Sequence, residues 1–254
     1  MPEVRLIPLG VGDAFSARHY TTCLALGVDD SWLLIDCPHP VRKMWREASM
    51  AALGEALDLD RVVGVAITHL HADHASGLED FAYLSHYALG RRATWLAHPE
   101  VSSRLWDGLL SAGMGEMRLS TDGPPERKRL DDYVDLVALD PIGAVELGPF
   151  AIECRPTRHS IATTAFRIRA GGRTFGFSAD TAFDPALIDW LAPADLIVHE
   201  ATTLDSSPVH TPYDRLAGLP EGLRARMYLT HLPDDFAAGS SRVEPLREGR
   251  CYPV

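Results

Sequence analysis

The stretch Thr68-His69-Leu70-His71-Ala72-Asp73-His74 decides the fold class and points to the chemistry. It begins at the last residue of Val62–Thr68, a continuous apolar run of the kind that forms a strand buried on both faces. Three imidazoles and a carboxylate at a strand end can converge on a borderline metal such as zinc, which accepts nitrogen and oxygen ligands. A coincidental polar loop is the alternative. The buried strand before the stretch and the helix start after it favour the metal site.

Three further polar residues also follow strand-like runs. They are His159 after Phe150–Arg158, Asp180 after Thr174–Ala179, and His231 after Met227–Thr230. Taken alone, each is more often a surface residue satisfied by water or a neighbour than a metal ligand. Together with the first stretch, the same residue types at the ends of successive strands predict one shared metal site.

Outward from this stretch, the chain alternates short β-rich runs with helical stretches, which predicts an α/β protein. Gly171-Gly172 predicts a hairpin turn, and Ser111–Gly143 predicts an irregular surface excursion. A helix is expected after Ser76, its N-cap, with Glu79 three residues later. Further strands are expected at Val4–Leu9, Thr22–Val28, Ser31–Asp36, Ala93–Ala97 and Asp195–His199, and helices at Val41–Leu57 and Glu100–Leu110.

Composition narrows the class of protein. The 254 residues predict a single domain spanning residues 1–254. The 24 basic and 35 acidic residues give a net charge of −11, which argues against sequence-blind coating of DNA. No apolar run is long enough for a membrane span. No signal peptide is recognisable and the four cysteines form no Cys-x-x-Cys pair, so we expect reduced thiols in a cytoplasmic protein.

At this point the chain resembles a known family. His69-Leu70-His71-Ala72-Asp73-His74 matches the His-x-His-x-Asp-His motif of the metallo-β-lactamase superfamily, and His159, Asp180 and His231 match its later ligands in order. The chain is most similar to the ribonuclease Z-like phosphodiesterase branch. The segments that carry this narrower resemblance are Leu9–Ala14 with Arg18 and Thr21-Thr22, Ser178–Thr181, His199–Thr202, Val209–Thr211 and Leu229–His231.

The resemblance implies a four-layer αβ/βα sandwich, in which two mixed sheets pack face to face, helices lie outside and metals bind at one edge. It also implies two divalent ions, with zinc expected and manganese or iron as alternatives. Asp180 would bridge the two ions. By resemblance, one ion would be bound by His69, His71 and His159, and the other by Asp73, His74 and His231.

The implied activity is hydrolysis of a phosphodiester by a hydroxide that bridges the two ions. The leaving oxygen then needs a proton. The resemblance places His210 for that task, with Glu200 as its orienting partner and Asp73 as a further member of the catalytic centre.

Two departures from the branch change the expected substrate. Members that process tRNA carry a long arm between the third histidine and the bridging aspartate, whereas twenty residues separate His159 from Asp180 here. Cys37-Pro38-His39-Pro40 also replaces the usual Gly-Glu-Gly-Thr-like turn. We therefore expect a small or cyclic phosphodiester as substrate and no tRNA, no DNA and no membrane as partners. A homodimer that lends Arg127–Arg129 across its interface is the exception that would restore tRNA binding.

Other functions stay open on sequence grounds. The same scaffold could support a lactonase, a thioesterase or a β-lactamase-like hydrolase. Ribonuclease Z-type tRNA processing is disfavoured because the arm is absent. A non-enzymatic metal-binding module that retains the ligands is the alternative outside the enzymes.

Overall fold

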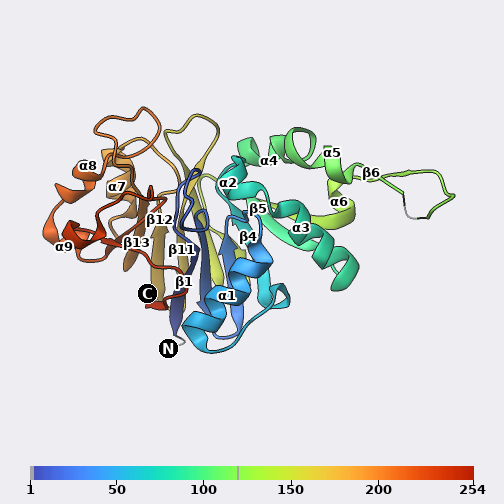
Figure 1. Cartoon of the computed structure of the whole chain (residues 1–254), viewed down its shortest axis with the longest axis horizontal. Coiled ribbons are helices and arrows are strands. Elements are labelled where there is room, and N and C mark those ends of the chain that lie inside the picture. Colours follow the sequence, from blue (N-terminus) through green and yellow to red (C-terminus); the bar gives the residue numbers. More distant parts are fainter. Residues whose placement is uncertain (1–2, 119) are drawn as a thin grey trace.

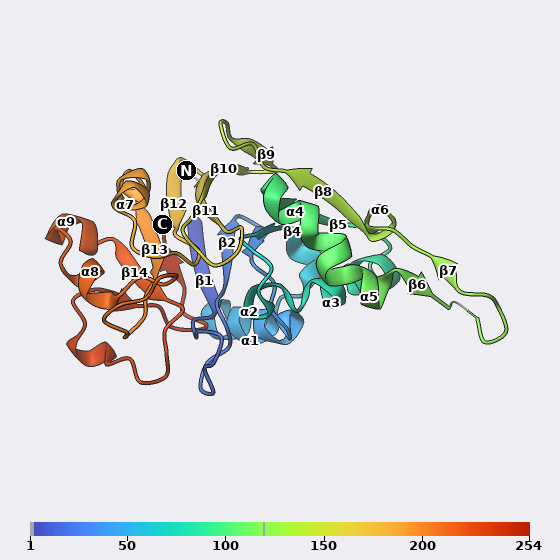
Figure 2. The same ribbon diagram turned by 90° about the horizontal axis from the view of Figure 1, so that it is seen from above.

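Two seven-stranded sheets pack face to face in the computed structural model, which describes residues 3–118 and 120–254 (Figures 1 and 2). The first sheet has the order β16 (Tyr252–Pro253), β1 (Val4–Gly10), β2 (Cys23–Val28), β3 (Ser31–Ile35), β4 (Val62–Ile67), β5 (Ala93–Ala97) and β8 (Val134–Ala138). The second has the order β15 (Glu244–Pro245), β14 (Met227–Thr230), β13 (Leu196–Glu200), β12 (Arg173–Phe177), β11 (Thr164–Ala170), β10 (Phe150–Pro156) and β9 (Val145–Leu147). The strands β3, β4, β5 and β8 are mutually parallel, as are β12 to β15.

Successive side chains of each central strand enter two different hydrophobic cores, one on each face of the sheet. In β2, Leu24 and Leu26 enter the core between the sheets, while Cys23 and Ala25 pack toward the helices. Side chains of a strand point to opposite faces in turn, so a strand covered on both sides must be apolar throughout. All six residues of β2 are buried for this reason.

Helices cover the outer face of each sheet, which completes the expected αβ/βα sandwich (Figure 1). The first sheet packs against α1 (Val41–Leu53), α3 (Leu78–Tyr83) and α4 (Pro99–Leu105), and the second against α7 (Pro185–Leu191), α8 (Tyr213–Ala217) and α9 (Glu221–Arg224). The remaining helical segments are η1 (Leu59–Arg61), α2 (Ala72–Ala75), η2 (Leu84–Ala88), η3 (Trp106–Leu110), α5 (Ser111–Met114), α6 (Leu130–Tyr133) and η4 (Ala238–Ser240).

Two helix predictions were wrong at their ends. The helix expected over Val41–Leu57 stops at Leu53, because Gly54 adopts the left-handed conformation at φ 77° and its N–H donates to the Met50 carbonyl. Ser76 does not cap the following helix. Its hydroxyl instead accepts a hydrogen bond from the His39 N–H, and α3 starts after Gly77 without a side-chain cap.

The segment Ser111–Gly143 is more ordered than the sequence suggested. Its last part forms β8, which pairs in parallel with β5 and completes the edge of the first sheet. The strands β6 (Glu116–Met117) and β7 (Glu126–Arg127) form a hairpin that projects from the body of the molecule (Figure 2). The expectation of an irregular excursion was therefore wrong for β8, whose alternation was too short to detect.

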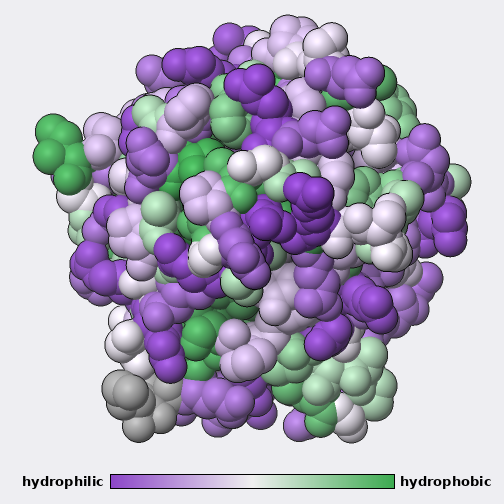
Figure 3. Space-filling model, turned by 90° about the vertical axis from the view of Figure 1, so that its left-hand side faces the viewer, coloured by the Kyte–Doolittle hydropathy of each residue, from purple (hydrophilic) through white to green (hydrophobic). Residues whose placement is uncertain are grey.

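The face of the molecule that carries α8 and α9 has the mixture of polar and apolar side chains usual for a folded domain. Figure 3 shows this face as mostly hydrophilic, with hydrophobic residues scattered in small groups. Such scattering is normal for a folded domain. None of the helices in residues 3–118 and 120–254 combines the length and hydropathy needed to cross a bilayer.

The carboxyl ends of the parallel strands meet at one edge of the sandwich. Thr68 follows β4, Asp180 comes shortly after β12, and His231 follows β14. His159 reaches the same edge from the end of β10, and the β11–β12 hairpin returns the chain to Asp180. That hairpin turns at Gly171 and Gly172, both with positive φ, as predicted.

Candidate active site

Three imidazoles meet at this edge. His69 and His71 follow β4, and His159 follows β10. The Nδ1 atom of His71 lies 3.0 Å from Nε2 of His69 and 3.1 Å from Nε2 of His159. Tetrahedral ligands about 2.0 Å from a zinc ion are about 3.3 Å apart, so these three ring nitrogens lie at nearly the spacing of ligands around one ion.

A second group lies beside the first. Asp73 and His74 belong to the short helix α2, and His231 follows β14. The Oδ2 atom of Asp73 lies 3.3 Å from Nε2 of His74 and 3.3 Å from Nε2 of His231. These distances also match the spacing of ligands around one ion.

Asp180 lies between the two groups and is 2% exposed. Its Oδ2 atom is 3.9 Å from Nε2 of His69 and 3.8 Å from Nε2 of His159, both in the first group. The same carboxylate approaches the second group, with Oδ2 at 3.4 Å from Nε2 of His231 and Oδ1 at 3.6 Å from Nε2 of His74. One carboxylate therefore faces both groups.

An unsatisfied nitrogen tests whether these residues fit a metal ion. The Nε2 atom of His74 is buried and has no hydrogen-bond partner in the described part of the chain. Its other ring nitrogen, Nδ1, lies 2.8 Å from Oδ2 of Asp36. Leaving a buried polar atom unpaired costs about 1–3 kcal/mol. A cation beside Nε2 would remove that cost, so the residues fit a divalent metal.

Outer hydrogen bonds orient the histidines of the first group. Nδ1 of His159 donates to the Val209 carbonyl at 3.0 Å, which leaves Nε2 unprotonated toward the site. Nδ1 of His69 donates to the Thr68 hydroxyl at 2.9 Å, and that hydroxyl donates in turn to Asp36. Such partners hold ligand histidines in one tautomer and one orientation.

The backbone is strained close to the site. Asp36, Ala179 and His231 have φ values of 64°, 50° and 55°, in the left-handed region that non-glycine residues rarely adopt. Each such residue costs about 1–3 kcal/mol and persists where its surroundings over-determine it. Here the strained residues are Asp36 and His231 themselves and the neighbour of Asp180.

The two groups differ in protonation. Burial lowers the pKa of His69, His71 and His159, so these imidazoles are neutral at pH 7. Burial acts in the same direction on His231, but the Asp180, Asp73 and Glu200 carboxylates together outweigh it and raise the pKa of His231 to about 9. Burial raises the pKa of Asp73, yet the neighbouring histidines lower it well below its ordinary value.

A histidine and a glutamate flank the metal ligands. The His210 ring lies 5.2 Å from the His231 ring and 5.2 Å from the His159 ring, between centroids. Its Nδ1 lies 3.3 Å from Oε1 of Glu200. Burial lowers the pKa of His210, but its hydrogen bond to Glu200 and the charge of that carboxylate raise it above the ordinary value.

Glu200 is held rigidly at the end of β13. It is 1% exposed, and its Oε1 accepts hydrogen bonds from the N–H groups of Thr181 at 2.9 Å and Thr211 at 3.1 Å. The carboxylate therefore anchors the loop that carries His210. Burial raises its pKa, and the hydrogen bond from His210 opposes that effect.

The structure brings together all the site residues that the sequence predicted, and it adds two findings. Asp36 supports both His74 and Thr68 but was not singled out; its place at the end of β3 was the available signal. Asp180, His210 and His231 form a third set of closely spaced donor atoms, so His210 also lies within reach of a cation.

Two residues of the segment between β1 and β2, Asp13 and His19, have structural partners outside the ligand groups. Asp13 forms a turn by accepting the Phe15 N–H at 3.0 Å. His19 is exposed, and its Nδ1 lies 3.6 Å from Oε2 of Glu248, outside both ligand groups.

Comparison with protein-family models gives one match over nearly the whole chain. The model described as "Anti-Pycsar protein Apyc1" matches residues 4–247. A protein of that name from Saccharibacillus brassicae is 28% identical over 253 residues, covering 97% of this chain and 98% of the relative. Another from Bacillus phage 010DV004 is 30% identical over 264 residues, covering 98% of each.

Solved structures confirm the fold. The metallo-β-lactamase fold protein YhfI from Bacillus subtilis is similar with a TM-score of 0.75 and 19% identity, covering 100% of both chains. Yeast PDE1 gives 0.75 with 13% identity over 100% of both chains, and the short form of human tRNase Z gives 0.67 with 18% identity over 98% of both.

The chain thus has the metallo-β-lactamase fold, and the interval between His159 and Asp180 holds the β11–β12 hairpin, as the sequence indicated. These matches and the His/Asp clusters support a hydrolase-type enzyme that binds divalent metal.

Proposed function

We propose a function from one premise: the chain belongs to the anti-Pycsar Apyc1 family. The proposed activity is metal-dependent hydrolysis of a small or cyclic phosphodiester, cyclic nucleotides included. The observation that carries it is the pair of ligand groups that share Asp180, with the His210–Glu200 pair packed against them.

The proposed ligands follow from the two groups. His69, His71 and His159 would hold one divalent ion, and Asp73, His74 and His231 the other, with Asp180 contacting both. When bound, two such ions would lower the pKa of a water molecule and stabilise the extra negative charge of a phosphoryl transition state. The donor set accepts zinc, manganese or iron.

His210 is proposed as the general acid. Its Nδ1–H donates to Oε1 of Glu200, and the Glu200 carboxylate raises the pKa of His210, which favours the protonated ring. Nε2–H is then the proton available to the leaving oxygen. The side chain of His210 is 27% exposed, so substrate can reach it, whereas the side chain of Glu200 is 1% exposed and acts through His210.

A small substrate also fits the rest of the molecule. The interval between His159 and Asp180 contains β11 and β12 and no arm. A tRNA is a polyanion whose affinity depends on many phosphate contacts, and the net charge of −11 opposes them. We expect weak, salt-sensitive or absent cleavage of precursor tRNA by this chain. Efficient cleavage at physiological salt, by a homodimer that contributes Arg127–Arg129, would contradict this expectation.

The test is a substrate panel on metal-defined protein. We expect chelation to abolish hydrolysis of adenosine 3′,5′-cyclic monophosphate or bis(nitrophenyl) phosphate, and zinc or manganese to restore it. Ester, thioester and lactone substrates serve as the comparison. Turnover confined to those substrates would replace the phosphodiesterase proposal with another hydrolase, and no turnover of any substrate at full metal loading would favour a binding module.

A further inference from the structure

The chain that follows His231 is bound by a segment from the other end of the sequence. Leu232 donates its N–H to the Val11 carbonyl at 3.0 Å, and the Leu232 carbonyl accepts the Asp13 N–H at 3.1 Å. These two bonds join the end of β14, which carries a proposed metal ligand, to residues 11–22, the β1–β2 loop. Figure 2 shows this loop, in blue, projecting from the body of the molecule.

His231 needs a restraint from outside because its backbone is strained. Its φ of 55° lies in the left-handed region, which non-glycine residues rarely adopt. At the usual negative φ the side chain would leave the backbone in another direction, and Nε2 would move away from Asp73 and Asp180. Bonds that fix the chain beside such a residue therefore set the position of its ring.

Asp234 fastens the tip of the β1–β2 loop to the same segment. Its Oδ1 accepts a hydrogen bond from the Ser16 hydroxyl at 2.5 Å, and its Oδ2 accepts one from the Ala17 N–H at 2.9 Å. The Asp234 carbonyl accepts a third bond, from Nη1 of Arg18 at 3.1 Å. Three consecutive loop residues thus bind one residue that lies three positions after His231.

The loop is folded so that Ser16 reaches Asp234. The Ser16 hydroxyl accepts the His19 N–H at 3.0 Å while it donates to Asp234. Gly12 packs against the inner side of this turn, where an added Cβ would lie 2.6 Å from the Cβ of Ser16 and 3.1 Å from that of His19. A side chain at position 12 would therefore displace Ser16, which gives this glycine a physical reason.

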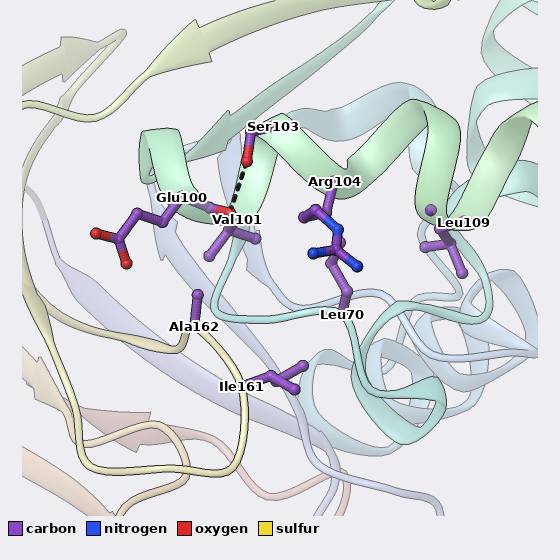
Figure 4. Close-up of a pocket in the computed structure, with 9 residues that line it drawn as sticks. Leu70, Glu100, Val101, Ser103, Arg104, Leu109, Ile161 and Ala162 are labelled. Carbon is purple, nitrogen blue, oxygen red and sulfur yellow. Dashed lines mark hydrogen bonds between the residues drawn. The ribbon is translucent and has the colours of Figure 1, made fainter.

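The loop that carries His159 is bordered differently. Ile161 and Ala162, just after this ligand, line a cavity of about 470 Å³ and face α4 across it (Figure 4). The His159 ring is held by its own bond to the Val209 carbonyl. Of the seven proposed metal ligands, all of which the structure describes, His231 alone has a left-handed backbone.

We infer that Asp234 is a positioning residue of the metal centre: by fastening the β1–β2 loop to the segment after His231, it holds the His231 ring beside Asp73 and Asp180. The inference rests on the two-ion centre of the proposed function and is independent of which substrate is hydrolysed. A ligand that is held in place before its ion arrives binds that ion more tightly, because less ordering is left to meet. Loss of Asp234 should therefore weaken the second ligand group and leave the first unchanged.

The metal affinities of Asp234→Ala give the first test. Competition of chelator-treated protein with a metal-sensitive dye measures both zinc affinities. We expect the affinity of the second group to fall about 10–100-fold, the usual cost of removing a partner that orients a metal ligand, and that of the first group to keep its wild-type value. Asp235→Ala is the matched control, because it removes the same charge from an exposed neighbour that forms no hydrogen bond with residues 11–20, all of which are described.

Further variants trace the effect along the loop. Ser16→Ala should lower the second affinity about three- to tenfold, which is the worth of one hydrogen bond, and adding it to Asp234→Ala should cost nothing more. Gly12→Ala displaces Ser16 and should reproduce the loss with the carboxylate intact. In Asp73→Ala protein, whose second group already lacks a ligand, Asp234→Ala should have little further effect.

Excess metal separates positioning from a general loss of stability. A weakened site refills as zinc is raised, so kcat of Asp234→Ala for a phosphodiester should return to the wild-type value at saturating zinc. A lower melting temperature with both zinc affinities unchanged would overturn the inference, as would an equal loss of affinity in Asp235→Ala. Absence of phosphodiester turnover in wild type would instead overturn the proposed function, with the affinities still measurable. A wild-type chain that binds only one ion would overturn both.

Discussion

The two ligand groups lie side by side and share Asp180, yet they differ in charge. The first group consists of His69, His71 and His159, whose pKa values burial lowers. The second contains a carboxylate, Asp73, and His231, whose pKa is raised to about 9. One centre therefore combines a group that is neutral and ready for a cation with a group whose protons a cation must displace.

The surroundings of the groups differ in the same way. His159 donates to a backbone carbonyl, a neutral partner, while His74 is paired through Nδ1 with the buried carboxylate of Asp36. A carboxylate behind a ligand histidine raises its basicity. We expect the second group to bind its ion more tightly at high pH and to lose that advantage as pH falls.

Removing the shared carboxylate should have the largest effect. Asp180→Ala deprives both groups of a ligand, so we expect both ions to be lost and phosphodiester turnover to fall by at least about 10³-fold, more than removal of a single electrostatic stabiliser costs. Elemental analysis and kcat/KM measure the two effects, with exposed Asp189→Ala as the control. One tightly retained equivalent would show that Asp180 serves a single group.

His210 tests whether the centre needs a proton donor beside its ligand groups. In His210→Ala we expect hydrolysis of diesters with alkoxide-like leaving groups to slow by about 10²–10⁴-fold, and of nitrophenyl diesters far less, because a good leaving group needs little protonation. Metal content should match wild type. Loss of metal would instead assign His210 to the donor set that it forms with Asp180 and His231.

The pH profile of the same reaction sharpens this prediction. Glu200 raises the pKa of His210, so the acid form is present below that raised pKa and disappears above it. We expect the rate for a poor leaving group to decline as pH rises through this pKa. The His210→Ala variant should lack the decline, and an unchanged profile in the variant would assign it to another group.

Single-ligand variants separate the two groups. His159→Ala should lower the metal affinity of the first group, and Asp73→Ala should lower that of the second. Each loss should exceed about 10–100-fold, the cost of removing a residue that only hydrogen-bonds to a metal ligand. Competition with a metal-sensitive dye measures the two affinities. Equal loss of both ions in each variant would mean that the groups fill only together.

The smallest expected effect is on the number of protons released when each group binds its ion. The pKa of His231 is raised to about 9 and that of His74 is also raised, so an ion that binds the second group must displace their protons, and its affinity should rise with pH below about pH 9. The first group, already neutral, should show no such rise. Calorimetry in buffers of different ionisation enthalpy counts the protons released when metal binds to the Asp73→Ala and His159→Ala variants. Equal proton release by the two variants would contradict the predicted difference between the two ligand groups.

Much of the fold was predictable because its signals are local. The apolar run Val62–Thr68 reads as a buried strand within a few residues, and Met227–Thr230 gave β14 with its observed bounds. The end of the first helix and the strand β8 were misjudged because their signals are weak. One left-handed glycine, Gly54, outweighs the helical spacing around it, and the five residues of β8, most of them exposed, carry too little pattern.

The sequence by itself determined the donor atoms of the site and the strand ends that carry them. A histidine or aspartate at the end of a buried strand is visible from its neighbours alone. Only the tertiary structure decided which donors lie close to one another, because those contacts join Asp73 to His231 across 158 residues and His71 to His159 across 88. It also decided the support of Thr68 by Asp36, since that bond joins two parallel strands that pair only in the folded sheet.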